Sequence, residues 1–378
     1  MNARRTNALR DLSQCAPPTS TPIRDAADLA HPDLHRGQRE FSFQIIERAQ
    51  WSTSLLDEVG SFLDSQDTSQ PFQRPEWAGD GWLLALVRRQ GQIQWLALCG
   101  VVYPASRFMR PIRALNVHRG PVCDDLDLLE KGQHELIAQA GKLGFAYIEI
   151  APEWTGEFAE SAAAMLARND WRVIPGVRST LRLSLIPSLD DLLASFRKTT
   201  RYEIRRSMNE GIEVRMAASD AESREFIEIY EAMAREREFP SETPEFLLGI
   251  GRWLATDKGH GCLLLAYEEG KPRGGILVVR SGVRCWYFLG ATSKDGKVGV
   301  GHLLQWRAIQ WAKENGCLEY DFNGYREDAT SGPALFKKGF CDRVVRFIPA
   351  HRYVVTPGRY RALEAISRVR RSLRSSLT

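Results

Sequence analysis

The chain has 378 residues, of which 43% are hydrophobic and 10% aromatic, so it is long enough for two globular domains and is not a disordered protein. The formal net charge is only +4, which allows a polyanionic partner without requiring one. The seven cysteines include no C-x-x-C pair, which argues against a disulfide framework or a zinc site and suits reduced thiols in a cytoplasm.

The first 40 residues predict a disordered leader. They are rich in Pro, Ser, Thr and Asp and carry early arginines, but they lack the apolar stretch of a secretory signal. No uninterrupted apolar run in the chain approaches the ~18–20 residues of a membrane span. We therefore expect a cytoplasmic protein whose leader covers residues 1–40.

Two parts of the chain repeat the same order of elements. The stretches that begin at Gly81 and Gly261 each predict a β-hairpin with a charged, glycine-containing turn. Residues 136–150 and 308–322 each predict a helix that ends at a glycine and passes at once into an alternating strand. This order indicates an internal duplication. We expect two domains of mixed α and β structure, over residues 41–180 and 181–350.

A basic helix is predicted over residues 188–211, with Ser188 as its cap and Gly211 at its end. One face carries charge at i, i+3 and i+7, with a tyrosine interleaved: Lys198, Arg201, Tyr202 and Arg205. Two interpretations are open. The stripe is either a solvated helix face or a contact to phosphates, for which arginine offers a bidentate fork.

A glycine-rich turn precedes the helix of the second repeat. Gly299 and Gly301 let the backbone turn tightly, Lys297 adds a positive charge, and the first N–H groups of the helix are free to bind an anion. The arrangement resembles the acyl-CoA pyrophosphate loop of the GNAT acetyltransferase superfamily, with Gly296 where that pattern has Arg or Gln. A plain glycine-rich turn into a helix is the alternative.

The stretch DFNGYREDATSGPALFKKGF contains the candidate catalytic residues. A predicted strand ends at Asp321, and a polar loop then leads to Phe336, Lys337 and Lys338. Active sites of α/β proteins lie beyond the carboxyl ends of strands. Lys337 is a candidate for stabilising an oxyanion, which is usually the largest catalytic term, and Asp321 for orienting groups or accepting a proton. A structural role is the alternative for the carboxylate.

Residues 351–378 predict a basic C-terminal tail helix. From Arg359 onward the segment has six arginines and one glutamate, and apolar residues recur at helical spacing. Contact with RNA, contact with the inner membrane surface and a solvated tail are the three interpretations. A non-catalytic RNA- or membrane-binding protein is therefore a hypothesis from a different functional class.

Several ordered motifs over residues 41–350 resemble the FemAB (FemABX) family of peptidoglycan-bridge aminoacyltransferases. They are QPFQRPEW from Gln70, NVHRGPV from Asn116, RYEIRRSMNEGIEV from Arg201, YFLGA from Tyr287, and EYDFNG followed by FKKGF. The resemblance implies two tandem GNAT-like domains. It also implies transfer of an amino acid from aminoacyl-tRNA to an amine of a peptidoglycan precursor, with no metal or other cofactor.

The resemblance also assigns roles to residues. Lys337, beside Phe336, matches the residue placed to stabilise the tetrahedral intermediate. Substrate contacts are expected at Arg201, Tyr202, Arg205, Arg237, Tyr287 and Lys338. The Arg-Tyr pair of relatives that use a nucleotide-linked precursor is not evident beyond Phe239, so a different envelope amine is an option.

An acyl-CoA-dependent N-acyltransferase of envelope or exopolysaccharide synthesis is the alternative enzyme. Its donor phosphates would bind at Lys297, Gly299 and Gly301. No stable protein partner is expected for either enzyme.

Overall fold

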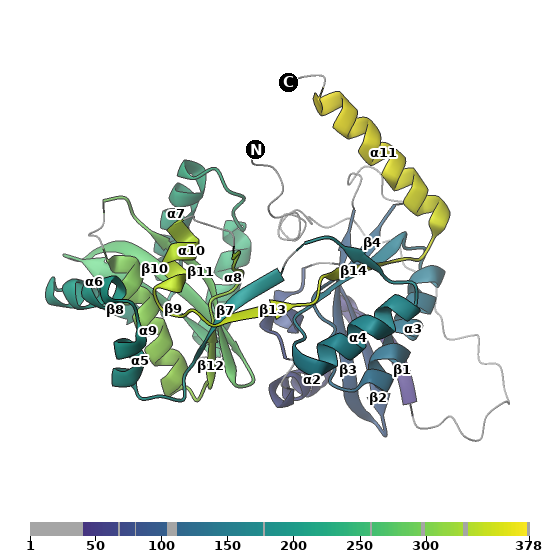
Figure 1. The fold of residues 1–378 in the computed structure, drawn as a ribbon, viewed down its shortest axis with the longest axis horizontal. Helices are drawn as coiled ribbons and strands as arrows, with labels where there is room; N and C mark the ends of the chain where they lie inside the picture. The colour runs from purple at the N-terminus through teal and green to yellow at the C-terminus, as the bar shows by residue number, and fades with distance from the viewer. Residues whose placement is uncertain are drawn as a thin grey trace.

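Two lobes of similar architecture make up the structure (Figure 1). The computed structural model describes residues 41–66, 69–79, 81–103, 112–176, 178–257, 259–295, 299–327 and 332–375. Each lobe contains a seven-stranded mixed sheet with flanking helices, which confirms the predicted fold class of two tandem mixed α and β domains. The predicted leader, residues 1–40, lies outside the described residues.

The first domain has the strand order β1-β2-β3-β4-β5-β14-β6. Its strands are β1 (Phe41–Glu47), β2 (Leu83–Arg89), β3 (Gln92–Val102), β4 (Ala114–Arg119), β5 (Tyr147–Pro152), β6 (Arg172–Ile174) and β14 (Ala350–Val354). Its helices are α2 (Thr53–Ser65), α3 (Leu126–Lys142), α4 (Gly156–Arg168) and α11 (Pro357–Ser375), with short 3-10 turns η2 (Arg48–Gln50), η3 (Pro71–Gln73) and η4 (Pro75–Trp77). Helices α3 and α4 share one apolar cluster with the sheet, and α2 shares another.

The second domain has the strand order β13-β7-β12-β11-β10-β9-β8. Its strands are β7 (Arg178–Ser184), β8 (Glu213–Met216), β9 (Gly261–Glu268), β10 (Lys271–Ser281), β11 (Arg284–Thr292), β12 (Glu319–Asp321) and β13 (Val344–Phe347). Its helices are α5 (Leu189–Ser195), α6 (Lys198–Asn209), α7 (Asp220–Glu236), α8 (Pro244–Thr256), α9 (Val300–Glu314) and α10 (Gly332–Lys338). Helices α5, α6 and α9 share one apolar cluster with the sheet, and α7 and α8 share another.

The repeated local patterns fold as predicted. Hairpin β2–β3 turns at Gln90–Gly91 and hairpin β9–β10 at Glu269–Gly270, and all four residues have positive φ, as tight hairpin turns require. Helices α3 and α9 are followed by Gly144 and Gly316 at φ 74° and 77°. A left-handed residue reverses the chain there so that β5 and β12 begin directly.

The two sheets also pair their strands in the same way. In each, four strands pair antiparallel in succession, the fourth pairs in parallel with a fifth, and two more antiparallel strands follow. The sixth position of the first sheet is filled by β14 from the end of the chain, whereas that of the second is filled by β7 from the connection between the domains. The first sheet thus takes β14 from the end of the predicted second domain and beyond, and β7 of the second sheet begins at Arg178, just before the predicted boundary at residue 180.

The predicted C-terminal tail is only partly a tail. Residues 350–354 form β14, which is hydrogen-bonded between β5 and β6. The first turns of α11 then place Tyr360, Leu363 and Ile366 against an apolar cluster that includes Tyr147. The segment up to Ile366 is thus part of the first domain, and the remainder of α11 extends away from the lobe (Figure 1).

The single helix predicted over residues 188–211 is two helices. Ser188 caps α5 by accepting a hydrogen bond from the Asp191 N–H, as predicted, but the chain becomes extended at Phe196. The Phe196 ring packs against Trp306 and Phe340, and the Arg197 N–H donates to the Gly339 carbonyl at 2.9 Å. These contacts with distant segments break the helix, and α6 starts in a new direction.

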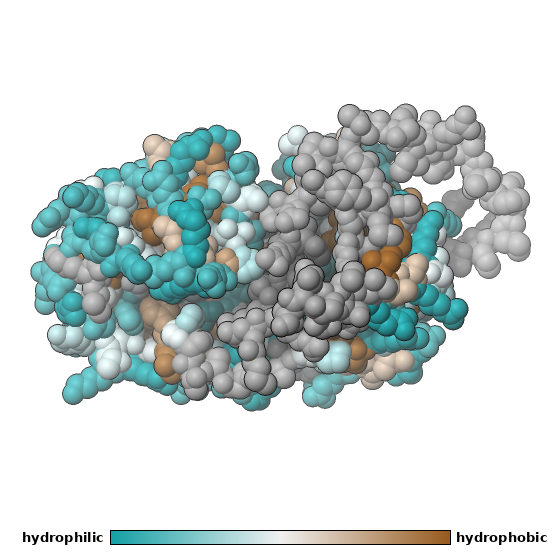
Figure 2. Space-filling view, turned by 90° about the horizontal axis from the view of Figure 1, so that it is seen from above, coloured by the Kyte–Doolittle hydropathy of each residue, from teal (hydrophilic) through white to brown (hydrophobic). Residues whose placement is uncertain are grey.

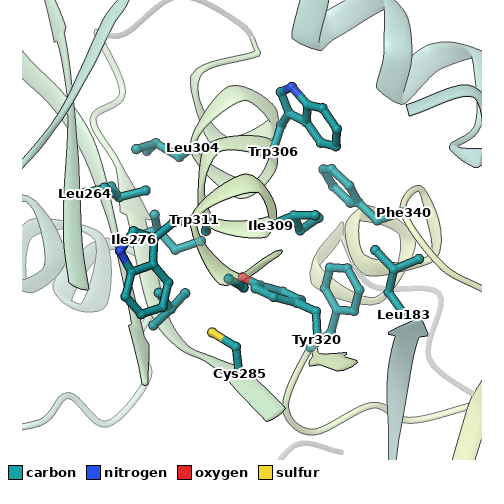
Figure 3. Packing of buried hydrophobic residues seen from close by; sticks show 14 of the residues in the cluster. Leu183, Leu264, Ile276, Cys285, Leu304, Trp306, Ile309, Trp311, Tyr320 and Phe340 are labelled. Carbon is teal, nitrogen blue, oxygen red and sulfur yellow. The ribbon is translucent and has the colours of Figure 1, made fainter. Parts of the chain in front are cut away.

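Helix α9 lies at the centre of the apolar core of the second domain (Figure 3). Ile309 and Trp306 point toward Tyr320 and Phe340, which come from β12 and from the turn after α10. The Gln305 amide donates to the Tyr320 hydroxyl inside this core. Packing of this kind sets the position of β12 and α10 relative to the amino end of α9.

The lobes meet through aromatic side chains. Trp77 and Phe72 of the first domain pack against Phe288 of β11 with ring centroids 4.8 Å and 5.5 Å apart, and Trp77 also contacts Phe246 of α8. All of these except Phe246 are buried. The two domains therefore share a continuous apolar contact.

The face of the second domain that Figure 2 shows has no large apolar patch. In Figure 2, hydrophobic residues form small separate groups among hydrophilic ones over the second domain. Across the described part of the chain, none of the helices combines the length and the apolar character needed to span a bilayer.

Candidate functional site

A cavity of about 600 Å³ opens in the second domain. Its walls come from the end of α7, from β10 and β11, from the amino end of α9 and from α10. Six predicted site residues line it: Arg237, Tyr287, Gly299, Gly301, Phe336 and Lys337. None of the described lining residues is acidic, so the cavity combines apolar walls with two cationic side chains.

The cavity exists because two neighbouring strands separate. Strands β11 and β12 pair in parallel over three residues each, ending at Trp286 and Asp321. Strand β11 continues to Thr292, while the chain after β12 turns away through Asn323 and Gly324, both left-handed at φ 52° and 53°. The cavity lies along the continuing part of β11, beyond the end of β12.

Lys337 points into this region with its ammonium group held in place. Its Nζ donates hydrogen bonds to the carbonyl oxygens of Asn323 and Gly324, the second at 2.8 Å, and lies 5.7 Å from the centroid of the Tyr287 ring. The lysine is thus fixed by the turn that follows β12 and faces an aromatic wall of the cavity. A cation held in this way is suited to stabilising negative charge that develops beside it.

Asp321 does not line the cavity. It is 1% exposed, and its carboxylate accepts from Arg182 Nε at 2.8 Å, from the Thr180 hydroxyl and from the Asn323 N–H at 2.8 Å. A carboxylate buried in this way does not touch a substrate, which leaves the predicted orienting role and the structural alternative. The aspartate instead holds the turn whose carbonyl groups receive Lys337.

The amino end of α9 borders the cavity at Gly299, which is left-handed at φ 102°. A Cβ on Gly299 would come within 2.9 Å of Oε2 of Glu203 in α6, so this carboxylate lies against the helix end. Among the described residues no donor forms a hydrogen bond to Glu203 Oε2, and its ion-pair partner Arg206 is 3.6 Å away. Lys297, the third predicted donor contact, lies outside the described residues.

The predicted basic stripe does not reach the cavity. Arg201 donates from Nη1 to the carbonyls of Ala194 and Phe196, so it satisfies the carboxyl end of α5. Tyr202 is 61% exposed and Arg205 is exposed on α6. The structure therefore gives Arg201 a local structural role and leaves the other two on a solvated face.

The two remaining predicted substrate-contact residues have different surroundings. Arg237, at the end of α7, lines the cavity, whereas Lys338 points away and lies 5.8 Å above the Tyr325 ring. Neighbouring lysines on α10 thus have different environments. This contrast makes Lys338 a natural control for Lys337.

His302 is a cavity residue that the sequence analysis did not select. It lies in the first turn of α9, with its ring 4.9 Å from that of Phe336. Burial lowers the pKa of His302, and the nearby Glu203 opposes this shift. The sequence did contain a signal for His302, because this residue directly follows Gly301. It therefore lies in the first turn of the helix that begins at the predicted phosphate-binding glycines.

Glu242 is a buried acid near this region, in the loop between α7 and α8. It is 7% exposed, and burial raises its pKa from 4.5 to about 7. Between pH 4.5 and about 7, Glu242 binds more protons in the folded chain than in the unfolded chain. Its contribution to the free energy of unfolding therefore falls as pH rises through this range.

Glu242→Gln is therefore expected to stabilise the protein at pH 8 by up to about 3 kcal/mol, and to have little effect at pH 4.5. Urea unfolding at the two pH values measures this difference. An equal effect at both values would contradict the assignment.

Metal ligation has no candidate within the described residues, because no group of three or more His, Cys, Asp or Glu side chains is arranged to hold an ion.

Comparisons with known proteins agree with the geometry of the fold. Residues 194–337 match the family model described as an acetyltransferase (GNAT) domain. The crystal structure of FemX superposes with a TM-score of 0.71 at 17% identity, covering 82% of this chain and 98% of FemX. No curated protein sequence matches the chain.

Two further solved structures share the fold at lower similarity. A conserved protein of unknown function from Bacteroides thetaiotaomicron has a TM-score of 0.56 at 12% identity, over 81% of this chain and 98% of that one. A tandem GNAT protein from the clavulanic acid biosynthesis pathway has a TM-score of 0.51 at 11% identity, over 84% and 99%.

The chain thus has a tandem GNAT-type fold. The chain shares the fold of FemX, as the ordered motifs predicted, and its second domain carries the match to the GNAT domain. The family match and the fold support an N-acyltransferase of the GNAT type.

Proposed function

We propose that the chain transfers an aminoacyl group from aminoacyl-tRNA to an amine of a peptidoglycan precursor or a related envelope molecule. The observation that carries the proposal is the Lys337 ammonium, anchored by two carbonyl groups at the wall of a cavity next to β11. The ordered motifs that resemble the FemABX family motivate this class of donor and acceptor, and the fold is the one that FemX has.

The chemistry needs an attacking amine and a stabilised oxyanion. The acceptor amine adds to the ester carbonyl, the carbonyl oxygen takes the negative charge, and the tRNA hydroxyl leaves when the carbonyl re-forms. Lys337 is placed to stabilise the oxyanion. His302 lines the same cavity and burial lowers its pKa, so its imidazole is suited to taking the proton that the amine loses and passing it to the leaving ribose oxygen.

A direct assay tests the proposal. Purified protein is incubated with charged tRNA, one amino acid at a time, and with a lipid-linked or nucleotide-linked peptidoglycan precursor. We expect transfer that ribonuclease treatment of the donor abolishes. Absence of transfer from a full panel of aminoacyl-tRNAs to either precursor would overturn it.

Acyl-CoA is the second candidate donor. The family model and the left-handed Gly299 at the amino end of α9 favour it, because such a helix end binds phosphates. The Glu203 carboxylate opposes it, since a negative charge at this helix end already interacts with the helix dipole and repels a diphosphate. We therefore place aminoacyl-tRNA first.

A substitution at Glu203 separates the two donors. Wild-type protein is expected to bind CoA weakly, and Glu203→Gln to bind it roughly 5- to 10-fold more tightly because the repelling charge is removed. Titration calorimetry with CoA measures both. Glu210→Gln is the matched control, since Glu210 also pairs with Arg206, at 3.0 Å, but at the far end of α6. Tight CoA binding by the wild type, unchanged in Glu203→Gln, would favour the acyl-CoA reaction.

The basic residues of α11 remain a proposed contact to RNA or to the inner membrane surface. Deleting residues 367–378 removes arginines without removing β14 or the packed turns of α11. A loss of binding to tRNA or to vesicles of anionic lipid would support such a contact, and unchanged binding to both would dispose of it.

A further inference from the structure

A residue of the first domain touches the turn that anchors Lys337. Arg119 ends β4, and its Nη2 donates a hydrogen bond to the Asn323 side-chain oxygen. The backbone carbonyl of the same asparagine accepts from Lys337 Nζ. A path of two hydrogen bonds thus joins the first domain to the lysine of the cavity.

Arg119 is itself held from several sides. Its Nη1 is 3.1 Å from Glu153 Oε1, and these side chains are 12% and 6% exposed. Its guanidinium lies 4.1 Å from the centroid of the Phe72 ring, which packs on Phe288 in the domain interface. Gln70 donates to the other oxygen of Glu153 at 2.9 Å. The guanidinium therefore has little freedom to leave Asn323.

Both ends of this contact have unusual backbone conformations. Arg119 has φ 57° and Asn323 has φ 52°, in the left-handed region that residues with a Cβ rarely adopt. Such conformations cost roughly 1–3 kcal/mol and persist where surrounding contacts determine them. Asn323 has two such contacts, since its N–H donates to Asp321 and its side chain accepts from Arg119.

We propose that Arg119 is a positioning residue that orients Lys337 through Asn323, so that the first domain completes the site of the second. The inference rests on the proposed role of Lys337 in acyl transfer. All the described residues that line the cavity belong to the second domain. The path from Arg119 to Lys337 would nevertheless make the site depend on the first domain. Loss of the contact frees the turn, and the carbonyl groups then hold the ammonium less firmly.

Trace acetylation of the full-length protein with acetic anhydride tests the proposal without any substrate. Mass spectrometry compares the labelling rate of Lys337 with that of Lys338 in the same molecules. Carbonyl acceptors favour the charged, unreactive form of the lysine. Arg119→Met and Asn323→Gly leave the two carbonyl acceptors of Lys337 in the chain but free the turn that carries them. Both are therefore expected to raise the relative rate of Lys337 by a few-fold, up to roughly tenfold if one of its hydrogen bonds is lost completely.

The variants are chosen so that each outcome is decisive. Asn323→Gly removes the side-chain oxygen that Arg119 binds, and glycine tolerates the left-handed backbone at this position. It also keeps the Arg119–Glu153 ion pair, so it still tests the proposal if Arg119→Met does not fold. The double variant is expected to label no faster than either single one, since both remove one contact. Arg113→Met is the control: Arg113 also lies over a ring, Phe145, and donates to a carbonyl, at 2.8 Å, but away from Lys337.

An unchanged Lys337 rate in folded Arg119→Met or Asn323→Gly would overturn the proposal. In the transfer assay the same two variants are expected to lower kcat, calculated per folded molecule, with little change in KM. The folded fraction is measured in the same samples, because partial unfolding alone would also lower the apparent kcat. If labelling changes as expected and no donor supports transfer, the positioning role stands and the proposed function fails.

Discussion

Lys337→Met is expected to lower kcat for acyl transfer by about 10²–10³, the usual cost of removing one group that stabilises an oxyanion. Methionine keeps the length and apolar character of the side chain but removes the charge. The lysine contacts two backbone carbonyls at the edge of a cavity and contributes little apolar burial, so thermal unfolding should shift only slightly.

Lys338→Met is the matched control, because it removes the same charge from the next residue of α10. Lys338 lies above Tyr325 and does not line the cavity, so its substitution should leave kcat within a few-fold of the wild type. Equal losses in the two variants, or loss of folding in Lys337→Met with specific activity retained, would show that Lys337 is structural.

Asp321→Ala is expected to have the largest effect on stability. The carboxylate is 1% exposed and pairs with Arg182, which is 5% exposed. Removing one partner of a buried ion pair leaves the other charge buried without compensation, which costs about 3–5 kcal/mol. The Thr180 hydroxyl and the Asn323 N–H lose their acceptor as well. Urea unfolding at pH 7 measures the loss.

Asp220→Ala provides the comparison for this stability effect. Asp220 pairs with Arg252 on the surface, where the two side chains are 44% and 59% exposed. Exposed pairs contribute little to stability, because water and salt screen them. A similar loss of stability in both variants would contradict the importance of burial at Asp321. Because Asp321 also holds the turn at Asn323, its variant should lower transfer even where enough protein stays folded.

Several features of the fold could be predicted because their causes are local. The hairpin turns and the glycines after α3 and α9 need positive φ, and the sequence places glycine there. The repeated order of hairpin, helix, glycine and strand was therefore enough to predict two similar domains. Ser188 likewise caps α5 as expected, since a cap depends on residues three positions apart.

Other features depend on residues far apart in the chain and could not be predicted. The continuous helical pattern of residues 188–211 breaks because Phe196 packs on Trp306 and Phe340. The insertion of β14 between β5 and β6 is a choice of hydrogen-bonding partner, and strand pairing between distant segments leaves no local signal.

The site shows the same division. By itself the sequence determined that Lys337 follows a strand end, beside Phe336 and after a glycine-containing loop, because residue order and local propensity are enough for that. Only the tertiary structure decided that Asp321 serves the fold, that Arg201 closes α5, and that Arg119 reaches Asn323. The physical reason is that these roles are hydrogen bonds and ion pairs whose partners meet only when the sheets and the two domains have packed together.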